Sequence, residues 1–360
     1  MEELRAQFPV FEQVAYLNAG TNGPVPRRAI EAAEASLREQ LEAGRCGKAW
    51  FEHQIERIDS LRERAAGLLG ADRADVALTS STTDGINAVL HALDLAPGDE
   101  LLTSDEEHPG VLGPIATARD TRGLSVRVVP FAELPGEVRP ETRLVVTSHV
   151  SWATGRVIDM APLAASDALV ALDGAQGLGA VPVDVRALGC DFYAASGQKW
   201  LCGPGGMGYL YASPELVPHL PAPWSGYHSM EDPERALEPA LRPDARRLNT
   251  GFPVPHHVEW CHAALDVLEE AGFEQVHDRG LQGAERLAGL LRERRVEVAP
   301  RGASTLVSFA APDPEELTAR AAEEGIVIRA IPGGSYARAS VGAWNTDDEL
   351  DRLAELVASA

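Results

Sequence analysis

Short apolar runs alternate with amphipathic stretches through the first two thirds of the chain. Apolar residues at helical spacing, as in Ile86, Val89, Leu90 and Leu93, predict helices, whereas short β-branched or apolar runs predict strands. The predicted strands cover residues 75–79, 100–104, 125–129, 143–150, 168–172, 191–195 and 208–211. Two of the predicted helices cover residues 26–43 and 51–69. This alternation predicts an α/β fold with an open, mostly parallel sheet.

The last third of the chain has a different pattern. Residues 213–247 are rich in proline and poorly periodic, which indicates a long connection. Two helical stretches follow, ending near residues 271 and 295, and then strands at 305–310, 326–331 and 336–342 with helices at 314–324 and from 346. This pattern predicts a small α+β domain. We therefore expect a large domain over residues 15–245, and a small domain from residues 1–14 plus 246–360.

The composition of the chain limits the kinds of partner that it can bind. The chain has 360 residues, enough for two domains, and a net charge of −22 disfavours nucleic acid or an anionic membrane surface. No apolar run is long enough for a membrane-spanning helix, and residues 1–7 lack a signal-peptide core, which predicts a cytoplasmic protein. The four cysteines show no metal-binding spacing, so we expect no metal site.

Polar residues that could bind a ligand or take part in catalysis lie where the predicted strands end. In open α/β sheets, ligands bind at the carboxyl ends of the strands. The residues at these ends are Thr82, His108, His149, Asp173 and Lys199. Their common position predicts one ligand cleft.

Residues 80–85, Ser-Ser-Thr-Thr-Asp-Gly, lie between a predicted strand and a predicted helix. Free N–H groups at the start of a helix, together with hydroxyl side chains, suit a phosphate. A plain helix N-cap needs only one such residue and is the alternative. The run of four hydroxyl residues, 80–83, favours a phosphate site modestly.

Lys199 is unusual because only two of the 32 basic residues, Lys48 and Lys199, are lysines. Lysine loses its proton far more readily than arginine, and the free amine can form a Schiff base with a carbonyl cofactor. A surface lysine in a loop is the alternative. Asp173 follows an apolar strand and could hold the pyridine nitrogen of such a cofactor, although Asp-Gly is also a simple turn signal.

Two motifs carry a resemblance to a known family. Asp173-Gly174-Ala175-Gln176 and Ser196-Gly197-Gln198-Lys199-Trp200 resemble those of the class V aminotransferase family, fold-type I enzymes that depend on pyridoxal phosphate. The family includes cysteine desulfurases, selenocysteine lyases, cysteine/cystine C–S lyases and isopenicillin N epimerase-like proteins. The resemblance extends from Tyr16 to Leu350. It implies a large domain with a mostly parallel sheet of seven strands and a smaller α+β C-terminal domain.

The resemblance also implies roles for individual residues. Lys199 would form the Schiff base and move protons at Cα, and His108 would stack on the ring and assist in proton transfer. The expected cofactor-binding residues are Lys199, Asp173, Gln176, His108, Thr82, Thr83, Ser196, Gln198 and Thr250. Gln198 departs from the histidine common in the family, and Thr250 resembles a threonine that reaches the neighbouring subunit's phosphate. A homodimer with shared active sites is therefore expected. The candidate substrate-binding residues are Arg338, His149, Trp152 and Asn18, with Arg338 matching the arginine that holds the α-carboxylate of an amino acid.

The reaction depends on two further stretches. Desulfurases of the family carry a catalytic cysteine shortly before the arginine matched by Arg338, but residues 329–337 contain none. A thiolate is needed to accept sulfur as a persulfide. Cys202 follows Lys199 too closely for this task, and Cys46 lies in a glycine-rich stretch that could approach a partner's site. Residues 148–157 resemble the C–S lyase branch, which favours β-elimination from cysteine, cystine or a cysteine conjugate. An aminotransferase, an epimerase or a scaffold without turnover are the alternatives.

Overall fold

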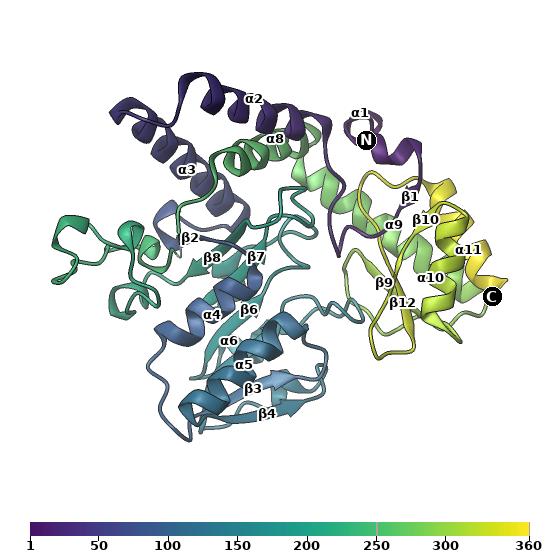
Figure 1. The fold of residues 1–360 in the computed structure, drawn as a ribbon. Helices are drawn as coiled ribbons and strands as arrows, with labels where there is room; N and C mark the ends of the chain where they lie inside the picture. The colour runs from purple at the N-terminus through teal and green to yellow at the C-terminus, as the bar shows by residue number, and fades with distance from the viewer. Residues whose placement is uncertain (250, 360) are drawn as a thin grey trace.

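The computed structural model describes residues 1–249 and 251–359. A central sheet of seven strands carries helices on both faces, and a smaller sheet-and-helix unit lies beside it (Figure 1). The central strands are β2 (Val76–Thr79), β3 (Glu100–Ser104), β4 (Ser125–Val129), β5 (Thr142–Ser148), β6 (Leu169–Asp173), β7 (Phe192–Ser196) and β8 (Gly208–Ala212). Every strand predicted for this region is present, and the prediction of an α/β fold with a mostly parallel sheet is confirmed.

The strand order is β2-β8-β7-β6-β5-β3-β4. Strands β3 to β7 pair in parallel, whereas β8 is antiparallel to both of its neighbours, β7 and β2. Strand β2 therefore points the same way as the parallel set. The carboxyl ends of all strands except β8 meet at one edge of the sheet, and this edge carries the site described below.

The sheet is apolar on both faces because successive side chains of a strand point to opposite sides. Leu101 and Leu144 belong to one buried cluster, and Leu102 and Val145 belong to another. The helices of this region are α2 (Arg27–Ala43), α3 (Lys48–Leu69), α4 (Thr82–Ala92), α5 (Pro109–Arg122), α6 (Met160–Ala164), α7 (Val185–Leu188) and α8 (Pro255–Ala271). Helices α4 and α5 cover one face, and α3, α6, α7 and α8 contribute to the cluster on the other.

The smaller unit contains the antiparallel strands β9 (Leu306–Ala310), β11 (Arg329–Ala330) and β12 (Tyr336–Ser340), with β12 in the middle. A parallel pair joins β1 (Ala15–Tyr16) to β10 (Ile326–Val327). The helices are α1 (Glu2–Ala6), α9 (Phe273–Glu293), α10 (Pro314–Glu323) and α11 (Asp347–Ala358). The single strand predicted over residues 326–331 is two strands, because its first half pairs with β1 and its second half with β12.

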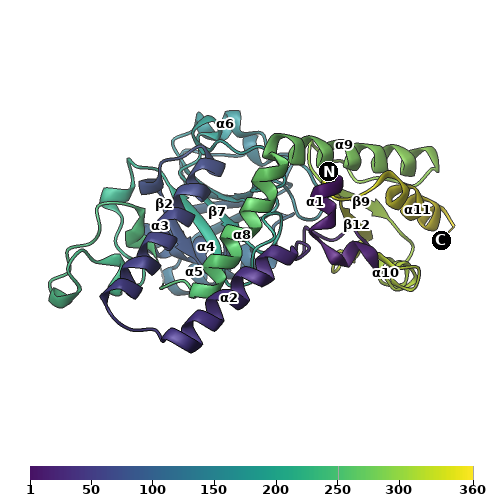
Figure 2. The same cartoon turned by 90° about the horizontal axis from the view of Figure 1, so that it is seen from above.

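The long connection predicted over residues 213–247 contains only short 3-10 turns: η4 (Val217–His219), η5 (Tyr227–Ser229), η6 (Pro233–Arg235) and η7 (Ala245–Leu248). Three more are η1 (Pro9–Glu12), η2 (Arg73–Asp75) and η3 (Leu134–Gly136). Figure 2 shows α8 lying along α2, and the two helices are in contact. Residues of α8 share a buried cluster with α3. The division of the chain at residue 246 stays a prediction.

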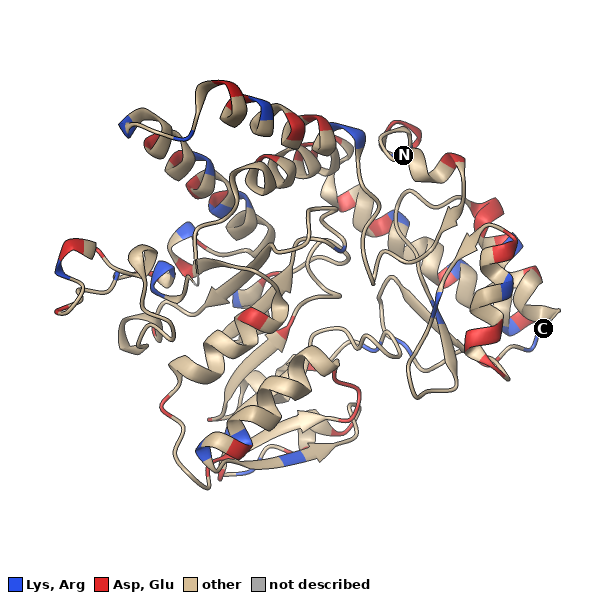
Figure 3. Cartoon of the chain, viewed as in Figure 1, with Lys and Arg blue, Asp and Glu red and all other residues tan. Residues whose placement is uncertain are grey.

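Many of the charged residues lie on outer helices. Figure 3 shows Asp and Glu residues spread over outer helices such as α2 and α11. None of the helices within residues 1–249 and 251–359 combines the length and the apolar character needed to cross a bilayer.

Candidate active site

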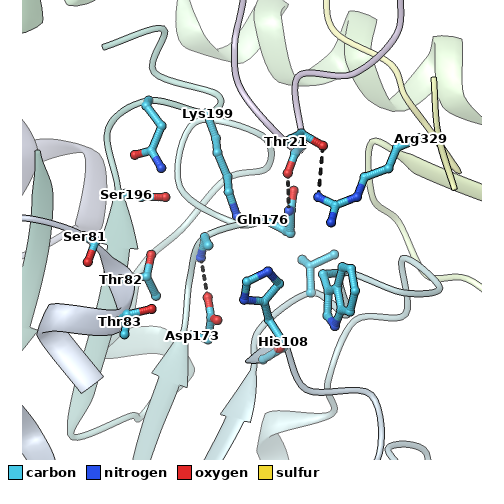
Figure 4. Close-up of a pocket in the computed structure, with 16 residues that line it drawn as sticks. Thr21, Ser81, Thr82, Thr83, His108, Asp173, Gln176, Ser196, Lys199 and Arg329 are labelled. Atoms are coloured by element: carbon cyan, nitrogen blue, oxygen red, sulfur yellow. Dashed lines mark hydrogen bonds between the residues drawn. The ribbon is translucent and has the colours of Figure 1, made fainter. Parts of the chain in front are cut away.

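A cavity lies at the edge of the central sheet where the strands end (Figure 4). Its volume is about 750 Å³ with the open mouth included. The lining residues are Gly20, Thr21, Ser81, Thr82, Thr83, His108, Ser148, Val150, Trp152, Asp173, Ala175, Gln176, Ser196, Gln198, Lys199 and Arg329. Asp173 is the only acidic residue among them, so the cavity is positively charged inside a strongly acidic chain.

Lys199 lies in the turn that follows β7, and Gly23 packs directly against its backbone. A Cβ atom at Gly23 would lie 1.9 Å from the carbonyl oxygen of Lys199, and the Gly23 N–H donates to the carbonyl of Gln198 at 2.8 Å. Burial, with Arg338 and Arg329 nearby, lowers the pKa of the Lys199 ammonium to about 8, against the opposing effect of Asp173. The amine is therefore far easier to deprotonate than that of an ordinary lysine.

Asp173 is the last residue of β6 and is buried below Lys199. Its Oδ1 accepts a hydrogen bond from the backbone N–H of Ala175 at 2.8 Å. Burial raises the pKa of the Asp173 carboxyl, although the charge of Lys199 acts in the opposite direction. A buried carboxylate of this kind is stabilised by a cationic N–H, which is what a protonated pyridine nitrogen provides.

A cup of neutral donors closes one end of the cavity. Ser81 is the N-cap of α4, and its hydroxyl accepts from the Asp84 N–H at 3.1 Å. The hydroxyls of Thr82 and Ser196 are buried and have no hydrogen-bond partner among the described residues. Buried hydroxyls normally have partners, so these two indicate a bound group with acceptor oxygens. The start of α4 adds backbone N–H groups and a positive dipole end.

The Gln198 side chain belongs to the same end of the cavity. Its Oε1 is buried and also lacks a partner among the described residues. Because the two ends of an amide are assigned rather than observed, a half-turn would present the NH₂ group to an anion. The cup then contains hydroxyls, an amide and backbone N–H groups, but no cationic side chain among its described residues.

His108 is the N-cap of α5 and has a defined tautomer. Its Nδ1 accepts a hydrogen bond from the backbone N–H of Gly110 at 2.9 Å, so the neutral ring carries its hydrogen on Nε2. Burial, followed by the charges of Lys199, Arg329 and Arg338, lowers the pKa of His108 to about 4. The ring lies edge-on to Trp152, with centroids 4.9 Å apart and an interplanar angle of 82°.

Gln176 is held from both ends of its amide. Its Nε2 donates to the carbonyl of Gly20 at 2.7 Å, and its Oε1 accepts from the indole N–H of Trp200 at 3.0 Å. The second hydrogen on Nε2 is the one that the predicted contact with a cofactor oxygen would use. That contact stays a prediction.

Two arginines from the small sheet lie at the opposite end of the cavity: Arg329 lines it, and Arg338 is completely buried beside Arg329. Arg329 on β11 and Arg338 on β12 are direct cross-strand partners. Each donates to the Thr21 hydroxyl at 3.3 Å, and Arg338 also donates to the carbonyl of Trp152 at 2.6 Å. Burial, and then the charge of Arg329, lowers the pKa of Arg338 to about 9. The predicted contact of Arg338 with the carboxylate of a substrate stays a prediction.

The structure brings most of the predicted residues to the cavity, but Arg338, His149 and Asn18 are not among its lining residues. His149 is buried behind the cavity, where its Nδ1 lies 3.0 Å from the Tyr193 hydroxyl, and the predicted substrate contact has no support from this position. Asn18 supports the site indirectly, because its Oδ1 accepts from the Thr21 hydroxyl at 2.7 Å. Thr250 lies outside the described residues.

Sequence reasoning missed Thr21 and Arg329, and it named Ser81 only as part of the 80–85 stretch; all three line the cavity. A signal for Arg329 exists, because it is a charged residue within an otherwise apolar strand run, Ile326 to Ile331. Ser81 is adjacent to the predicted phosphate residues. Nothing in the local pattern marks Thr21, which reaches the cavity only because the N-terminal segment crosses it.

The family model described as aminotransferase class V matches residues 15–353. The chain belongs to the class V aminotransferase family. The expected resemblance is thereby confirmed, and it covers almost the whole chain.

Relatives of this class V protein carry several activities. The isopenicillin N epimerase of Streptomyces clavuligerus is 28% identical, over 98% of this chain and 96% of its own. A cysteine desulfurase of Dickeya dadantii is 30% identical, over 98% of this chain and 95% of its own. The cystine C–S lyase C-DES, solved with its product cysteine persulfide, is 27% identical with a TM-score of 0.90, covering 98% of this chain and 99% of that one. A C-DES variant with glycine covalently linked to its PLP cofactor also gives 0.90, at 28% identity and 98% coverage of both chains. These similarities confirm the fold-type I architecture.

The residues present fit pyridoxal phosphate. Lys199 supplies an amine with a lowered pKa, and Asp173 supplies a buried carboxylate at the floor. The unpartnered hydroxyls of Thr82 and Ser196 supply donors for a phosphate. His108 also lines the cavity, near Asp173 (Figure 4). An amine, a buried carboxylate and phosphate donors are the groups that this cofactor needs from a protein, and the cavity of this chain offers all three.

Proposed function

We propose that this class V protein, a pyridoxal-phosphate-dependent enzyme acting on amino acids, is a C–S β-lyase. Its substrate would be cysteine, cystine or a cysteine conjugate. The overall reaction takes the conjugate and water to a thiol, pyruvate and ammonium. When bound, the cofactor supplies an electron sink that makes the Cα proton acidic.

The chain's own residues supply the remaining steps. Lys199, buried and easily deprotonated, removes the proton from Cα. Arg338 holds the α-carboxylate and so fixes which Cα bond faces Lys199. His108, neutral and with its hydrogen on Nε2, donates a hydrogen bond to the departing sulfur, and the Lys199 ammonium formed by the first step supplies the proton that this sulfur takes up. Asp173, a buried carboxylate, would hold the pyridine nitrogen of the cofactor in its protonated form.

The observation that carries the proposal is the lack of a thiol at the cavity. None of its lining residues within the described ranges is a cysteine. Cys190, Cys202 and Cys261 are buried, and burial raises the pKa of each thiol, to about 12 for Cys190 and Cys261. The exposed Cys46 lies on the connection between α2 and α3. A persulfide-forming desulfurase needs a reactive thiolate, whereas β-elimination needs none.

Product identification tests the proposal. The purified holoenzyme is incubated with L-cystine, L-cysteine and S-substituted cysteines, and pyruvate, ammonia, alanine and amino-acid stereochemistry are measured. Equal amounts of pyruvate and ammonia support a β-lyase. Alanine with enzyme-bound persulfide would indicate a desulfurase, pyridoxamine phosphate with a keto acid an aminotransferase, and a D-amino acid an epimerase. Any of these three as the main product contradicts the proposal.

A homodimer with shared active sites is part of the same proposal. Large apolar side chains are exposed at regular spacing on α2 (Leu37 and Leu41) and on α3 (Phe51 and Ile55). Further exposed apolar residues lie on the 213–247 connection, where Leu237 is fully exposed. A second copy would cover these surfaces. Light scattering coupled to gel filtration should give twice the chain mass, and a monomeric mass would contradict it.

A further inference from the structure

The arginine end of the cavity holds more positive charge than one α-carboxylate requires. Arg329 and Arg338 face each other across β11 and β12, and both donate to Thr21 Oγ1. The Thr21 hydroxyl gives its own hydrogen to Asn18, so both of its lone pairs serve the two guanidinium groups. Within the described residues, neither arginine has a carboxylate of the chain as an ion-pair partner. Like charges directly opposite on a sheet are destabilising, and bound anions would remove this cost.

The two arginines differ in their placement. Arg338 is completely buried, and its Nε has no hydrogen-bond partner among the described residues. It also holds the backbone carbonyl of Trp152. Arg329 is only half-buried and lines the cavity itself. If Arg338 takes the α-carboxylate, Arg329 remains for another part of the substrate.

Trp152 forms the wall beside Arg329. The Arg329 guanidinium lies over the indole ring, 5.5 Å from its centroid, and the His108 ring contacts the indole edge-on. The indole N–H is buried and has no partner among the described residues. Indole N–H and guanidinium groups are donors only. This wall therefore offers hydrogen-bond donors and a positive charge, with no acceptor to receive a cationic or donor-bearing side chain.

We propose that Arg329 and the indole N–H of Trp152 form a side-chain subsite for substrates whose side chain ends in an anionic group, such as a carboxylate, sulfinate or sulfonate. The inference rests on the proposed action on amino acids, with Arg338 holding the α-carboxylate. Arg329 is then a specificity residue, because it distinguishes substrates by the far end of the side chain.

The test uses two ligands of nearly equal shape. S-carboxymethyl-L-cysteine ends in a carboxylate, and S-carbamoylmethyl-L-cysteine ends in the neutral amide. Binding to the holoenzyme is read in a stopped-flow instrument from the first change in the visible spectrum of the cofactor. This change precedes any cleavage, so the result stands whether or not the C–S bond is broken. The wild-type enzyme should bind the carboxylate ligand at least about tenfold more tightly than the amide ligand.

Two substitutions separate the arginines. Arg329→Gln should abolish the preference for the carboxylate ligand and change the affinity for the amide ligand by less than about threefold. Trp152→Phe, which keeps a ring but removes the N–H, should reduce the preference in part. Arg338→Gln is the matched control and should weaken both ligands alike. Equal weakening of both ligands by Arg329→Gln would overturn the proposal, since Arg329 would then share the α-carboxylate. The absence of a preference in the wild-type enzyme would overturn it as well.

Discussion

At one end of the cavity, hydroxyl side chains and backbone N–H groups follow directly after strands β2 and β7. At the other end, Thr21, Trp152 and Arg329 come from three distant parts of the chain, and Arg338 is buried beside Arg329. The first end is neutral in its described side chains and suits a group with many acceptor oxygens. The second is strongly cationic and suits a ligand that brings its own negative charge. Cofactor binding thus depends on neutral hydrogen-bond donors, whereas substrate selection depends on positive charge. Lys199 and Asp173 lie between the two ends.

The largest expected effect is at Lys199, which serves both ends. Lys199→Ala should reduce turnover by about 10³-fold or more, because both the Schiff base and the proton transfer are lost. Borohydride reduction followed by mass spectrometry should find the cofactor on Lys199. Lys48→Ala is the matched control, since Lys48 is exposed and pairs only with Glu52 at 3.6 Å. Cofactor trapped on Lys48, or full activity in Lys199→Ala, would contradict this assignment.

Asp173→Asn tests the floor of the cavity. The neutral amide cannot hold the pyridine nitrogen protonated, so kcat should fall by about 10²- to 10³-fold. The apoprotein should become more stable at pH 7, because the substitution removes a buried carboxylate whose pKa is raised by burial. Thermal unfolding of the apoprotein reads the second effect separately. A drop in both activity and apoprotein stability would indicate a structural role instead.

Arg338→Gln tests the substrate end. Loss of a buried arginine from the α-carboxylate should lower kcat/KM by about 10²-fold for every amino acid, mainly through KM. The visible spectrum of the enzyme without substrate should stay close to that of the wild type, because Arg338 is absent from the cavity lining and affects Lys199 only through its charge. A changed cofactor spectrum with unchanged KM would remove the distinction between the two ends.

The lowered pKa of Lys199 predicts how the apoprotein captures its cofactor. With a pKa of about 8, the fraction of free amine rises about tenfold from pH 7 towards a plateau above pH 9. The second-order rate of pyridoxal phosphate capture should rise with it. Between pH 8 and 10.5 the unfolded chain binds more protons at this lysine than the folded chain, so apoprotein stability should increase with pH through this window. A rate that rises only above pH 10 would contradict the lowered pKa.

Gln198→His should give the smallest effect. A protonated histidine beside the phosphate would donate a charge-assisted hydrogen bond, which is stronger than the hydrogen bond from the neutral amide of Gln198. The substitution should therefore slow the loss of cofactor by about three- to tenfold. Dialysis against a cofactor scavenger measures this loss, and Gln198→Ala should accelerate it. If Gln198→His releases the cofactor faster than the wild type does, the amide of Gln198 binds the phosphate more strongly than a histidine does at this position.

The two ends also differ in how well the sequence predicts them. Thr82, Thr83, Asp173, Ser196 and Lys199 stand next to strand ends, so strand patterns alone place them at one edge of the sheet. Thr21 and Arg329 could not be placed in this way. Arg329 reaches the cavity only because β11 pairs with β12, and Thr21 because the segment after β1 crosses the strand ends. Such long-range pairings leave no local pattern in the chain.

His149 shows the limit of strand-end reasoning. It directly follows β5, as predicted, yet its side chain points behind the cavity to Tyr193. Successive residues of an extended chain face opposite sides, so Ser148 lines the cavity and His149 does not. The position of a strand end can be predicted from sequence, whereas the direction of each side chain requires the register.

The ratio of pyruvate to alanine formed from L-cysteine by the purified holoenzyme tests the central claim most directly. A thiol-free cavity predicts pyruvate with an equal amount of ammonia and almost no alanine, and the same ratio in Cys46→Ser. Alanine as the main product, lost in Cys46→Ser, would show that a thiol takes part in sulfur transfer and would contradict the account.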